Sequence, residues 1–485
     1  MKTQIICAVA GALVMALTAA ERSAAEVLEL RTDVCIVGGG SGGCGAAIAA
    51  ARAGVGVILV ERQRWLGGTS TSAYVCSWPP GPADSIAREI SQLLSKLPNA
   101  VGITSDHNAD RRKGPFGLWL ITPGQTYQQT LRRAGLPRKQ WRAVVFDPAA
   151  LDKVLSQMLA ETGNCRVLLE TSFVEAKTKA KRVLSIAAGS ADGSKYRIRA
   201  RVFIDSTGGV ALCRKIGCET MLGPESASRF GEPSAPREPG MTLNAISLCY
   251  RIRPSNNPVR QPEPDTPAKG WPRSAHVGEV PGGDRIVNPL ALVPGRALID
   301  VGYQQTMALA KRRAQAHWRW LQGYPTFAGY EMDSFAPMLG VRETYRVVGE
   351  YVLTEHDLRR GLQKQGHQDV IALADHSMDV HGEGGRRVHG QLEGPYGIPY
   401  RCLVPKGRQN LLVACRGASF SHIAASSCRL SRTMIALGHA AGLAAAMAVE
   451  NNVPVGDIDV AALQRQLGIP LREPQGTSVP RRQKP

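Results

Sequence analysis

The side chains best suited to binding and proton transfer in this 485-residue sequence are two arginines and three histidines. Arg342 and Arg346 stand four residues apart, so a helix would place them on one face. Two guanidinium groups on one face could bind a carboxylate through paired hydrogen bonds. The alternative is a surface ion pair, which contributes little, and Arg429 has the same two interpretations. The pair is a candidate site for an anionic substrate.

The histidines offer a proton acceptor, because imidazole changes its protonation near neutral pH. His422 is the first candidate, since it lies among small residues after a predicted strand that ends at Arg416. A structural hydrogen bond is the alternative role for this side chain. His376 and His381 are further candidates, and with Asp379 they offer metal-ligand types. Their spacing matches no known ligand pattern, so we predict no metal site.

A glycine-rich segment of the sequence indicates a second kind of binding site. The apolar run Val34–Val37 predicts a buried strand, and the Ala-rich segment Ala46–Ala53 predicts a helix. Between them stand Gly38, Gly40 and Gly43 in the spacing Gly-x-Gly-x-x-Gly. In a dinucleotide-binding turn the first glycine permits the tight turn, the second lets backbone approach the phosphates, and the third lets the helix pack closely. The helix N-terminus then faces the phosphates.

The residues after this turn support the same interpretation. A second predicted strand, Val55–Val60, ends in Glu61, where the motif expects an acid that binds a ribose hydroxyl. Gly67, Gly68 and Thr69 then form a second loop that a plain nicotinamide-dinucleotide domain does not usually have. A glycine turn with a solvated Glu61 is the alternative. The strand, turn, helix and acid in this order favour a dinucleotide site.

Composition excludes several other functions. The net charge is +19, but the basic residues are spread along the chain and no nucleic-acid-binding motif is present, so we predict no nucleic-acid partner. Solvated basic faces are the simplest explanation of the charge, and an anionic substrate or surface is the alternative. The eleven cysteines form no CxxC pair, so neither a zinc ribbon nor a thioredoxin-like motif is indicated. In an oxidising compartment some could form disulfides, but the spacing does not indicate which.

The two ends of the chain have their own signals. Residues 1–25 contain Lys2, the apolar run Ile5–Ala20 and small-residue cleavage positions, which together predict a cleaved signal peptide and a periplasmic or secreted protein. An uncleaved anchor is the alternative. After cleavage we expect no membrane span, because no other segment approaches the ~18 apolar residues needed. The basic tail, 470–485, is predicted to be disordered.

Further periodic segments predict helices near 85–97, 148–162, 303–322, 352–363 and 430–450. Asp192-Gly193 predicts a hairpin turn. Residues 254–294 contain nine prolines and predict a long irregular excursion.

Four blocks of sequence together resemble a known family. They are residues 34–69, described above, Val202–Gly208, Val341–Thr354 and Gly397–Gly442. The chain resembles, over about residues 30–450, the bacterial FAD-dependent oxidoreductases whose flavin domain is like that of glutathione reductase, fumarate reductase flavoproteins and the aromatic hydroxylases.

The resemblance implies FAD as the cofactor and an α/β fold. A Rossmann-like FAD-binding domain, with a central parallel sheet plus a small antiparallel sheet, would carry an inserted α+β substrate domain. The implied FAD-binding domain comprises residues 26–77, 145–240 and 396–450, and the implied substrate or cap region comprises 78–144 and 241–395.

The resemblance also implies where FAD binds. Gly38, Gly40 and Gly43 would hold the diphosphate and Glu61 the adenosine ribose, while Val174 would offer backbone to the adenine. The other implied cofactor-binding residues are Ser41, Gly42, Arg62, Gly67, Gly68, Thr69, Thr207, Gly208, Arg416, Gly417, Ala441 and Gly442. Cys415, where the family usually has glycine, could be inert packing, a redox partner or a covalent attachment point.

The function implied is hydride transfer between FAD and a small organic substrate, with an anionic substrate as one possibility. The protein would supply orientation and the proton acceptor. Quinone, cytochrome and oxygen are all open as electron acceptors. Two other functions stay open, an exported electron-transfer flavoprotein and a flavin-binding protein without catalysis.

Overall fold

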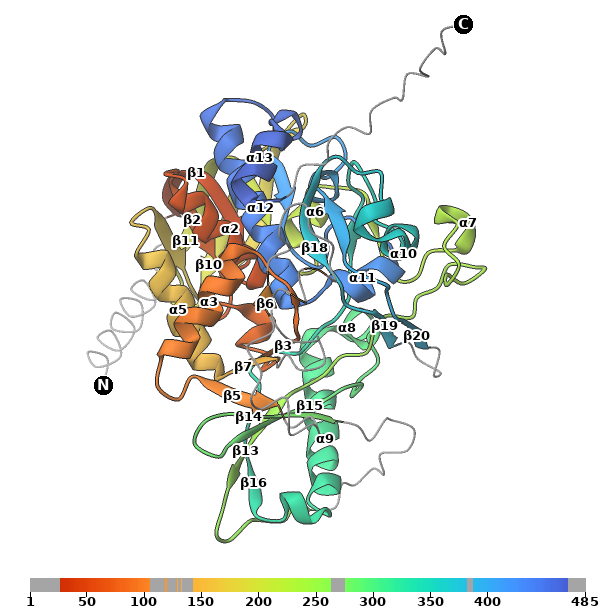
Figure 1. The fold of residues 1–485 in the computed structure, drawn as a ribbon. Helices are drawn as coiled ribbons and strands as arrows, with labels where there is room; N and C mark the ends of the chain where they lie inside the picture. Colours follow the sequence, from red (N-terminus) through yellow and green to blue (C-terminus); the bar gives the residue numbers. More distant parts are fainter. Residues whose placement is uncertain are drawn as a thin grey trace, which may run out of the picture.

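The computed structural model describes residues 27–104, 118–119, 129, 132, 143–262, 275–381 and 387–469. The predicted signal peptide and the predicted disordered tail lie outside the described residues. Within them, the chain forms two seven-stranded sheets with helices packed on both, seen as the upper and lower parts of Figure 1.

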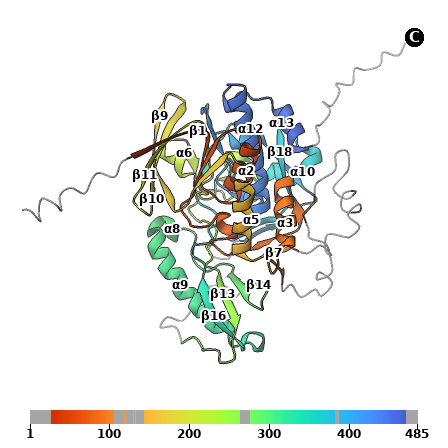
Figure 2. The same cartoon turned by 90° about the vertical axis from the view of Figure 1, so that its left-hand side faces the viewer.

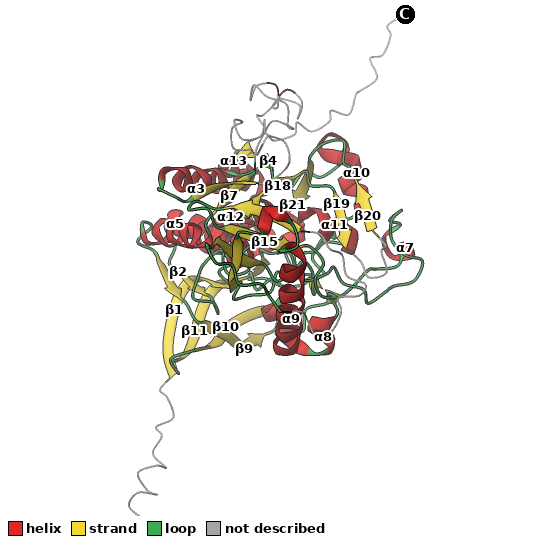
Figure 3. Cartoon of the chain, turned by 90° about the horizontal axis from the view of Figure 1, so that it is seen from below, coloured by secondary structure: helices red, strands yellow, loops and turns green. Residues whose placement is uncertain are grey.

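The first sheet is central and mostly parallel. Its order is β8-β2-β1-β11-β10-β9. Strand β22 pairs with the C-terminal end of β11, on the edge that faces away from β1. Strands β8, β2, β1, β11 and β22 are parallel, whereas β10 is antiparallel to β11 and β9 is antiparallel to β10 (Figure 3). This arrangement confirms the predicted fold class. The strands are β1 (Val27–Val37), β2 (Val57–Val60), β8 (Cys165–Leu168), β9 (Thr171–Lys179), β10 (Arg182–Ser190), β11 (Lys195–Asp205) and β22 (Leu411–Val413).

Helices α2 (Ser41–Arg52) and α12 (Ser431–Glu450) pack on this sheet and on each other, backbone against backbone. Small residues make this contact possible. A Cβ added at Gly438 would lie 2.0 Å from the carbonyl oxygen of Gly42, and one at Gly442 would lie 2.3 Å from that of Ala46. Helix α2 begins five residues before the predicted Ala46, because its glycine-rich first turn packs closely and does not need intrinsic helix propensity.

Two further helices begin after an aspartate whose side chain caps the helix N-terminus. The side chain of Asp147 accepts hydrogen bonds from the backbone N–H groups of Ala149 and Ala150, and Pro148 occupies the first helical position. Asp84 accepts from Ala87 in the same way. These helices are α5 (Pro148–Ala160) and α3 (Ser85–Lys96).

The second sheet has the order β16-β13-β15-β14-β5-β7-β3. Helix α9 (Gly302–Leu321) packs against it (Figure 2). The buried ring of Trp318 meets the ring of Tyr250 edge-on, with 6.1 Å between the ring centroids. The described strands are β3 (Ser77–Trp78), β5 (Val101–Thr104), β7 (Val144–Phe146), β13 (Tyr250–Pro254), β14 (Ala275–Glu279), β15 (Arg285–Pro289) and β16 (Tyr330–Phe335). They come from the predicted substrate or cap region and its borders, and the exact division into regions stays a prediction.

The expectation of an irregular excursion over 254–294 was wrong for two segments, β14 and β15. The prolines do not break these strands because they lie at their ends and in the turn between them. Pro254 ends β13, Pro289 ends β15, and Pro281 lies in the turn that joins β14 to β15.

Among the described residues, α12 is long and apolar enough to cross a membrane, and 89% of its most apolar window is buried inside the protein. The expectation that no segment after the leader approaches this composition was therefore wrong. The helix is apolar because it is rich in alanine and glycine. These small residues pack against α2 and β18, as in a core helix.

Short elements complete the described structure. The two-stranded sheets are β4 (Gly81–Pro82) with β6 (Leu118–Trp119), β12 (Thr220–Met221) with β17 (Arg346–Val347), β18 (Val370–Ala374) with β21 (Tyr396–Pro399), and β19 (Met378–His381) with β20 (Arg387–Gly390). The other helices are α6 (Ala211–Lys215), α7 (Ala227–Phe230), α8 (Ala297–Asp300), α10 (Glu355–Lys364), α11 (His422–Cys428) and α13 (Val460–Leu467).

Candidate functional site

A cavity of about 1170 Å³ lies at the carboxyl ends of β1, β2 and β11. This edge is where open α/β sheets bind ligands. Side chains of the second sheet and of α9, among them Asn288 and Tyr303, close the other side. Cavities that take a drug-sized ligand measure roughly 300–1,000 Å³, so this one has room for a dinucleotide and a substrate together.

The glycine turn has the geometry that its spacing predicts. Gly38 has φ 102°, and a Cβ there would lie 2.4 Å from the carbonyl oxygen of Ser206. A Cβ on Gly43 would lie 1.8 Å from the carbonyl oxygen of Gly38. Gly40 differs, because it lines the cavity and a Cβ there would meet no described atom within 4 Å. The space beside Gly40 is therefore open to a diphosphate, above the N-terminus of α2.

Glu61 lies at the end of β2 and lines the same cavity. Its carboxylate accepts hydrogen bonds from the N–H of Gly39 (2.6 Å) and of Gln63 (2.7 Å). Burial raises the pKa of Glu61, while these backbone donors favour its charged form. Each oxygen keeps a second lone pair, so the carboxylate can also accept from a ribose hydroxyl.

A second strand-end acid, Asp205, shapes the opposite wall. It accepts hydrogen bonds from the N–H (3.0 Å) and the hydroxyl (2.8 Å) of Thr207 and from the N–H of Cys213 (2.9 Å). These bonds hold Thr207 and Gly208 at the cavity. The guanidinium of Arg416 lies over Gly208, where an added Cβ would be 2.6 Å from Nη1. Its buried Nε has no hydrogen-bond partner among the described residues, so this wall offers an unused donor.

Cys415, beside Arg416, also lines the cavity. Burial raises the pKa of its thiol to about 12, and the backbone N–H of Gly417 lies 3.4 Å from the sulfur. A protonated, buried thiol is a poor nucleophile. The structure therefore favours inert packing among the three interpretations of Cys415.

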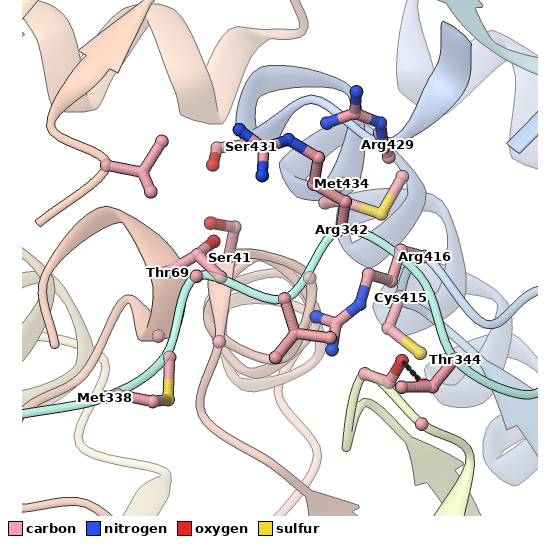
Figure 4. A pocket seen from close by; sticks show the side chains of 18 of the residues that line it. Ser41, Thr69, Met338, Arg342, Thr344, Cys415, Arg416, Arg429, Ser431 and Met434 are labelled. Atoms are coloured by element: carbon pink, nitrogen blue, oxygen red, sulfur yellow. Dashed lines mark hydrogen bonds between the residues drawn. The ribbon is translucent and has the colours of Figure 1, made fainter. Parts of the chain in front are cut away.

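Two arginines, Arg342 and Arg429, lie together on the far wall (Figure 4). Arg342 Nη1 donates to the carbonyl oxygen of Ala245 (2.7 Å) and to the hydroxyl of Ser247 (2.9 Å). Burial and the neighbouring Arg429 lower the pKa of Arg342 to about 10. The buried Nε of Arg429 has no partner among the described residues. The two guanidinium groups make this wall cationic.

Asp379 and His381 lie on β19 beside the arginines. His381 Nε2 is 2.8 Å from Asp379 Oδ2, and Arg429 Nη2 donates to the same oxygen at 3.0 Å. Burial opposes ionisation of Asp379, but His381 and Arg429 lower its pKa below the usual range. His376 also lines the cavity, and burial, together with Arg429, lowers its pKa to about 4. His376 is therefore neutral at neutral pH.

The prediction that Arg342 and Arg346 share a helical face is wrong. Residues 341–345 form no helix, and Arg346 begins β17. Arg346 is buried away from the cavity lining, where Nη2 donates to Glu225 at 2.9 Å. Because the chain is not helical here, the four-residue spacing does not bring the two guanidinium groups together.

His422, the predicted base, does not line the cavity. It is the first residue of α11 and is buried, with Nδ1 2.7 Å from Glu343 Oε1. Burial opposes ionisation of Glu343, but His422 and then Arg346 lower its pKa to about 2. The structure gives His422 the alternative role of a structural hydrogen bond.

The other predicted cofactor residues fall into two groups. Val174 is 57% exposed, although its neighbours Ser172 and Phe173 line the cavity. Gly417 packs on Val210 and Tyr345, and Gly43, Gly67, Ala441 and Gly442 are likewise absent from the lining. The predicted cofactor residues that line the cavity are Gly38, Gly40, Ser41, Gly42, Glu61, Arg62, Gly68, Thr69, Thr207, Gly208 and Arg416.

The sequence left Arg429 undecided, and it offered His381 as a candidate proton acceptor or, together with Asp379, as a candidate metal ligand. Among the described residues, no group of three or more histidines, cysteines and acids could hold a metal ion. The alternation of Asp379 and His381 in an extended strand was the signal for their pairing, and β19 has this geometry.

The solved structures that resemble this chain include a reductase-like protein, a halogenase and a monooxygenase. A geranylgeranyl bacteriochlorophyll reductase-like protein from Thermoplasma acidophilum has 13% identity over 90% of this chain and 82% of that one, with a TM-score of 0.43. The myxobacterial chondrochloren halogenase, an FAD-dependent enzyme, has 12% identity over 90% and 78%, with a TM-score of 0.38. The p-nitrophenol 4-monooxygenase of Pseudomonas putida has 18% identity over 64% and 68%, with a TM-score of 0.38.

No curated protein matches this chain. The family profile described as FAD dependent oxidoreductase, in contrast, matches residues 33–467. These residues include the glycine turn, most of both large sheets and the cavity wall formed by Arg342 and Arg429, here called the arginine wall. The match covers most of the sequence, and the open space beside Gly40 and the buried Glu61 suit the cofactor. The chain belongs to the FAD-dependent oxidoreductase family, and its cofactor is FAD.

Proposed function

We propose that this enzyme transfers hydride between FAD and a small organic anion and that it works outside the cytoplasm. One observation carries the substrate class. Arg342 and Arg429 lie side by side in the same cavity as the glycine turn, next to the Asp379–His381 pair.

The cavity residues divide the work between cofactor and substrate. Gly38, Gly40 and the start of α2 would hold the diphosphate of FAD, and Glu61 would hold its adenosine ribose. The bound flavin supplies a two-electron acceptor and donor. Arg416, buried over Gly208, would direct its unpartnered Nε toward the cofactor or substrate.

The arginine wall favours an anion because its charge is only partly neutralised. Asp379 is the carboxylate that pairs with Arg429, whereas Arg342 is held by two uncharged acceptors. Burial lowers the pKa of both guanidinium groups, so desolvation disfavours their charged forms. A substrate carboxylate between them would relieve this cost and accept charge-assisted hydrogen bonds.

His381 is the proton acceptor that this geometry favours. As hydride leaves a substrate carbon, a hydroxyl or amine on that carbon must lose a proton. Asp379 orients His381 through the 2.8 Å contact with Nε2 and would stabilise the imidazolium that forms. His376, neutral because of its low pKa, is the weaker candidate.

The extracytoplasmic location rests on the predicted signal peptide, residues 1–25. We further propose that the flavin domain is of the kind found in glutathione reductase and fumarate reductase flavoproteins. The electron acceptor would be a quinone, a cytochrome or oxygen.

An anaerobic screen tests the proposal. Holoenzyme is mixed with small 2-hydroxy and 2-amino acids and with their methyl esters, and bleaching of the visible flavin absorbance is followed. We expect at least one free acid to bleach the flavin much faster than its ester. Bleaching by esters as fast as by acids would exclude the anionic class, and a flavin that no organic donor bleaches would favour a non-catalytic or electron-transfer protein.

A further inference from the structure

Two cysteines lie together at the C-terminal end of α6: Cys213 within the helix and Cys218 just after it. The turn that contains Thr207 precedes this helix. Gly217 follows this helix with φ 73°. The N–H of Cys218 donates to the carbonyl oxygen of Cys213 (2.9 Å), and the N–H of Gly217 donates to that of Arg214 (3.1 Å). These two bonds define a Schellman helix end, in which the side chains at the positions of Cys213 and Cys218 commonly come into contact. A hydrogen bond joins the thiols of Cys213 and Cys218.

The two thiols differ in a way that suits disulfide exchange. Cys213 is buried, and burial raises its pKa well above the usual value. Cys218 is partly exposed. The hydrogen bond with Cys213 and the nearby Arg408, whose Nη2 also donates to Ile216 (2.7 Å), outweigh burial and lower the pKa of Cys218 to about 7. A thiol whose pKa lies near the ambient pH is the most effective attacking group.

We propose that Cys213 and Cys218 form a redox-active dithiol that closes to an intramolecular disulfide by exchange with a small-molecule disulfide such as oxidised glutathione. The thiolate of Cys218 attacks one sulfur of the oxidant, whose S–S bond breaks and releases a first glutathione. Cys213 then loses its proton and attacks the Cys218 sulfur, which releases the second glutathione. Two electrons and two protons pass from the dithiol to the two glutathione molecules.

This site is separate from the proposed substrate chemistry, although it lies next to residues that would hold the cofactor. The N–H of Cys213 donates to Asp205, and Asp205 holds Thr207 at the cavity. The disulfide would therefore form at the base of a cofactor-binding turn. Export through the predicted signal peptide would deliver the pair to an oxidising compartment, where disulfides persist.

Peptide mapping of the wild-type holoenzyme tests the pair directly. Trypsin cuts after Arg214 and Lys215, so the disulfide would join peptides 202–214 and 216–229 until it is reduced. After treatment with oxidised glutathione we expect this joined pair. Cys165 is the matched comparison, because it is also partly exposed but burial raises its pKa to about 12. In the reduced protein we expect native alkylation of Cys218 to be at least about tenfold faster than that of Cys165.

Three variants separate the steps. Cys213→Ser should retain glutathione on Cys218, because the resolving thiol is gone. Cys218→Ser should leave Cys213 unmodified, and the control Cys165→Ser should give the same joined peptides as the wild type. The proposal is overturned if oxidised glutathione gives no joined peptides in the wild type, or if Cys165 reacts as fast as Cys218.

Discussion

Arg429 Nη2 lies 3.0 Å from Asp379 Oδ2, the carboxylate oxygen that His381 also contacts. One carboxylate thus joins the cationic wall of the cavity to the candidate base. Arg429 keeps a buried Nε without a partner among the described residues. This geometry leaves a donor for a substrate while the arginine is already fixed in place.

Replacing Arg429 with methionine should weaken binding of the anionic substrate. A charge-assisted hydrogen bond contributes about 1.5–3 kcal/mol, so we expect KM to rise roughly 10–100-fold, with a smaller effect on kcat. Arg429→Lys, which keeps a point charge, should recover part of the loss. Steady-state kinetics measures both variants, and an unchanged flavin spectrum is the control. An unchanged KM in Arg429→Met would remove Arg429 from the substrate site.

Replacing His381 with glutamine should act on kcat. Loss of a general base costs roughly 10²–10⁴-fold, while Arg342 and Arg429 would still bind the anion. Reduction of the flavin in single-turnover experiments should slow by this factor. His376→Gln is the matched control and should keep most of the activity, because burial and Arg429 lower the pKa of His376 to about 4 and make it a weak proton acceptor. If His376→Gln has the larger effect on kcat, the roles of the two histidines are reversed.

Alanine substitutions at two glycines of the same turn should have different effects, one on FAD binding and one on the stability of the fold. Gly40→Ala should fold, because its added Cβ meets no described atom within 4 Å, but the methyl group would occupy the space that the diphosphate needs. Gly43→Ala should destabilise the fold itself, because its Cβ would lie 1.8 Å from the carbonyl oxygen of Gly38.

Thermal melting of the apoprotein and titration with FAD separate these effects. We expect an unchanged Tm with weakened FAD binding for Gly40→Ala and a lowered Tm for Gly43→Ala. Equal FAD affinity of Gly40→Ala and the wild type would show that the diphosphate does not approach Gly40.

FAD should be released when the protein unfolds. The thiol of Cys415 lines the cavity, but burial raises its pKa to about 12, so it is protonated and unreactive at neutral pH. Acid precipitation should leave the flavin in the supernatant, and Cys415→Ser should bind FAD as the wild type does. Flavin that stays with the precipitate in the wild type but not in Cys415→Ser would establish covalent attachment.

The parts that could be predicted from sequence are those set by local spacing. Gly38, Gly40 and Gly43 bend one strand into one helix, and Glu61 ends the next strand, so a short segment fixes their relation. Asp147, which caps α5 from the position directly before Pro148, is another relation set by local spacing.

The arginine wall of the cavity could not be predicted in the same way. Arg342, Asp379 and Arg429 come from three distant segments, and only tertiary packing decides which of the many arginines faces the cavity. The helical pairing of Arg342 with Arg346 failed because this segment is not helical, which a four-residue spacing alone cannot show. His422 was misplaced because the buried partner Glu343, far away in sequence, fixes its ring.

The buried network around Glu343 predicts how stability depends on pH. Its carboxylate is paired with His422 and lies 3.8 Å from Arg346, and these groups hold its pKa at about 2, below the ordinary value of 4.5. A carboxyl group with a lowered pKa stabilises the fold above its unfolded pKa. That contribution, on the order of 3 kcal/mol for such a shift, should be lost as the pH falls from about 4.5 to about 2. Glu343→Gln should therefore be less stable than the wild type at neutral pH, and the difference should shrink toward pH 2. Urea unfolding over this pH range measures it, and a constant difference between the two proteins would contradict the ion-pair role of Glu343.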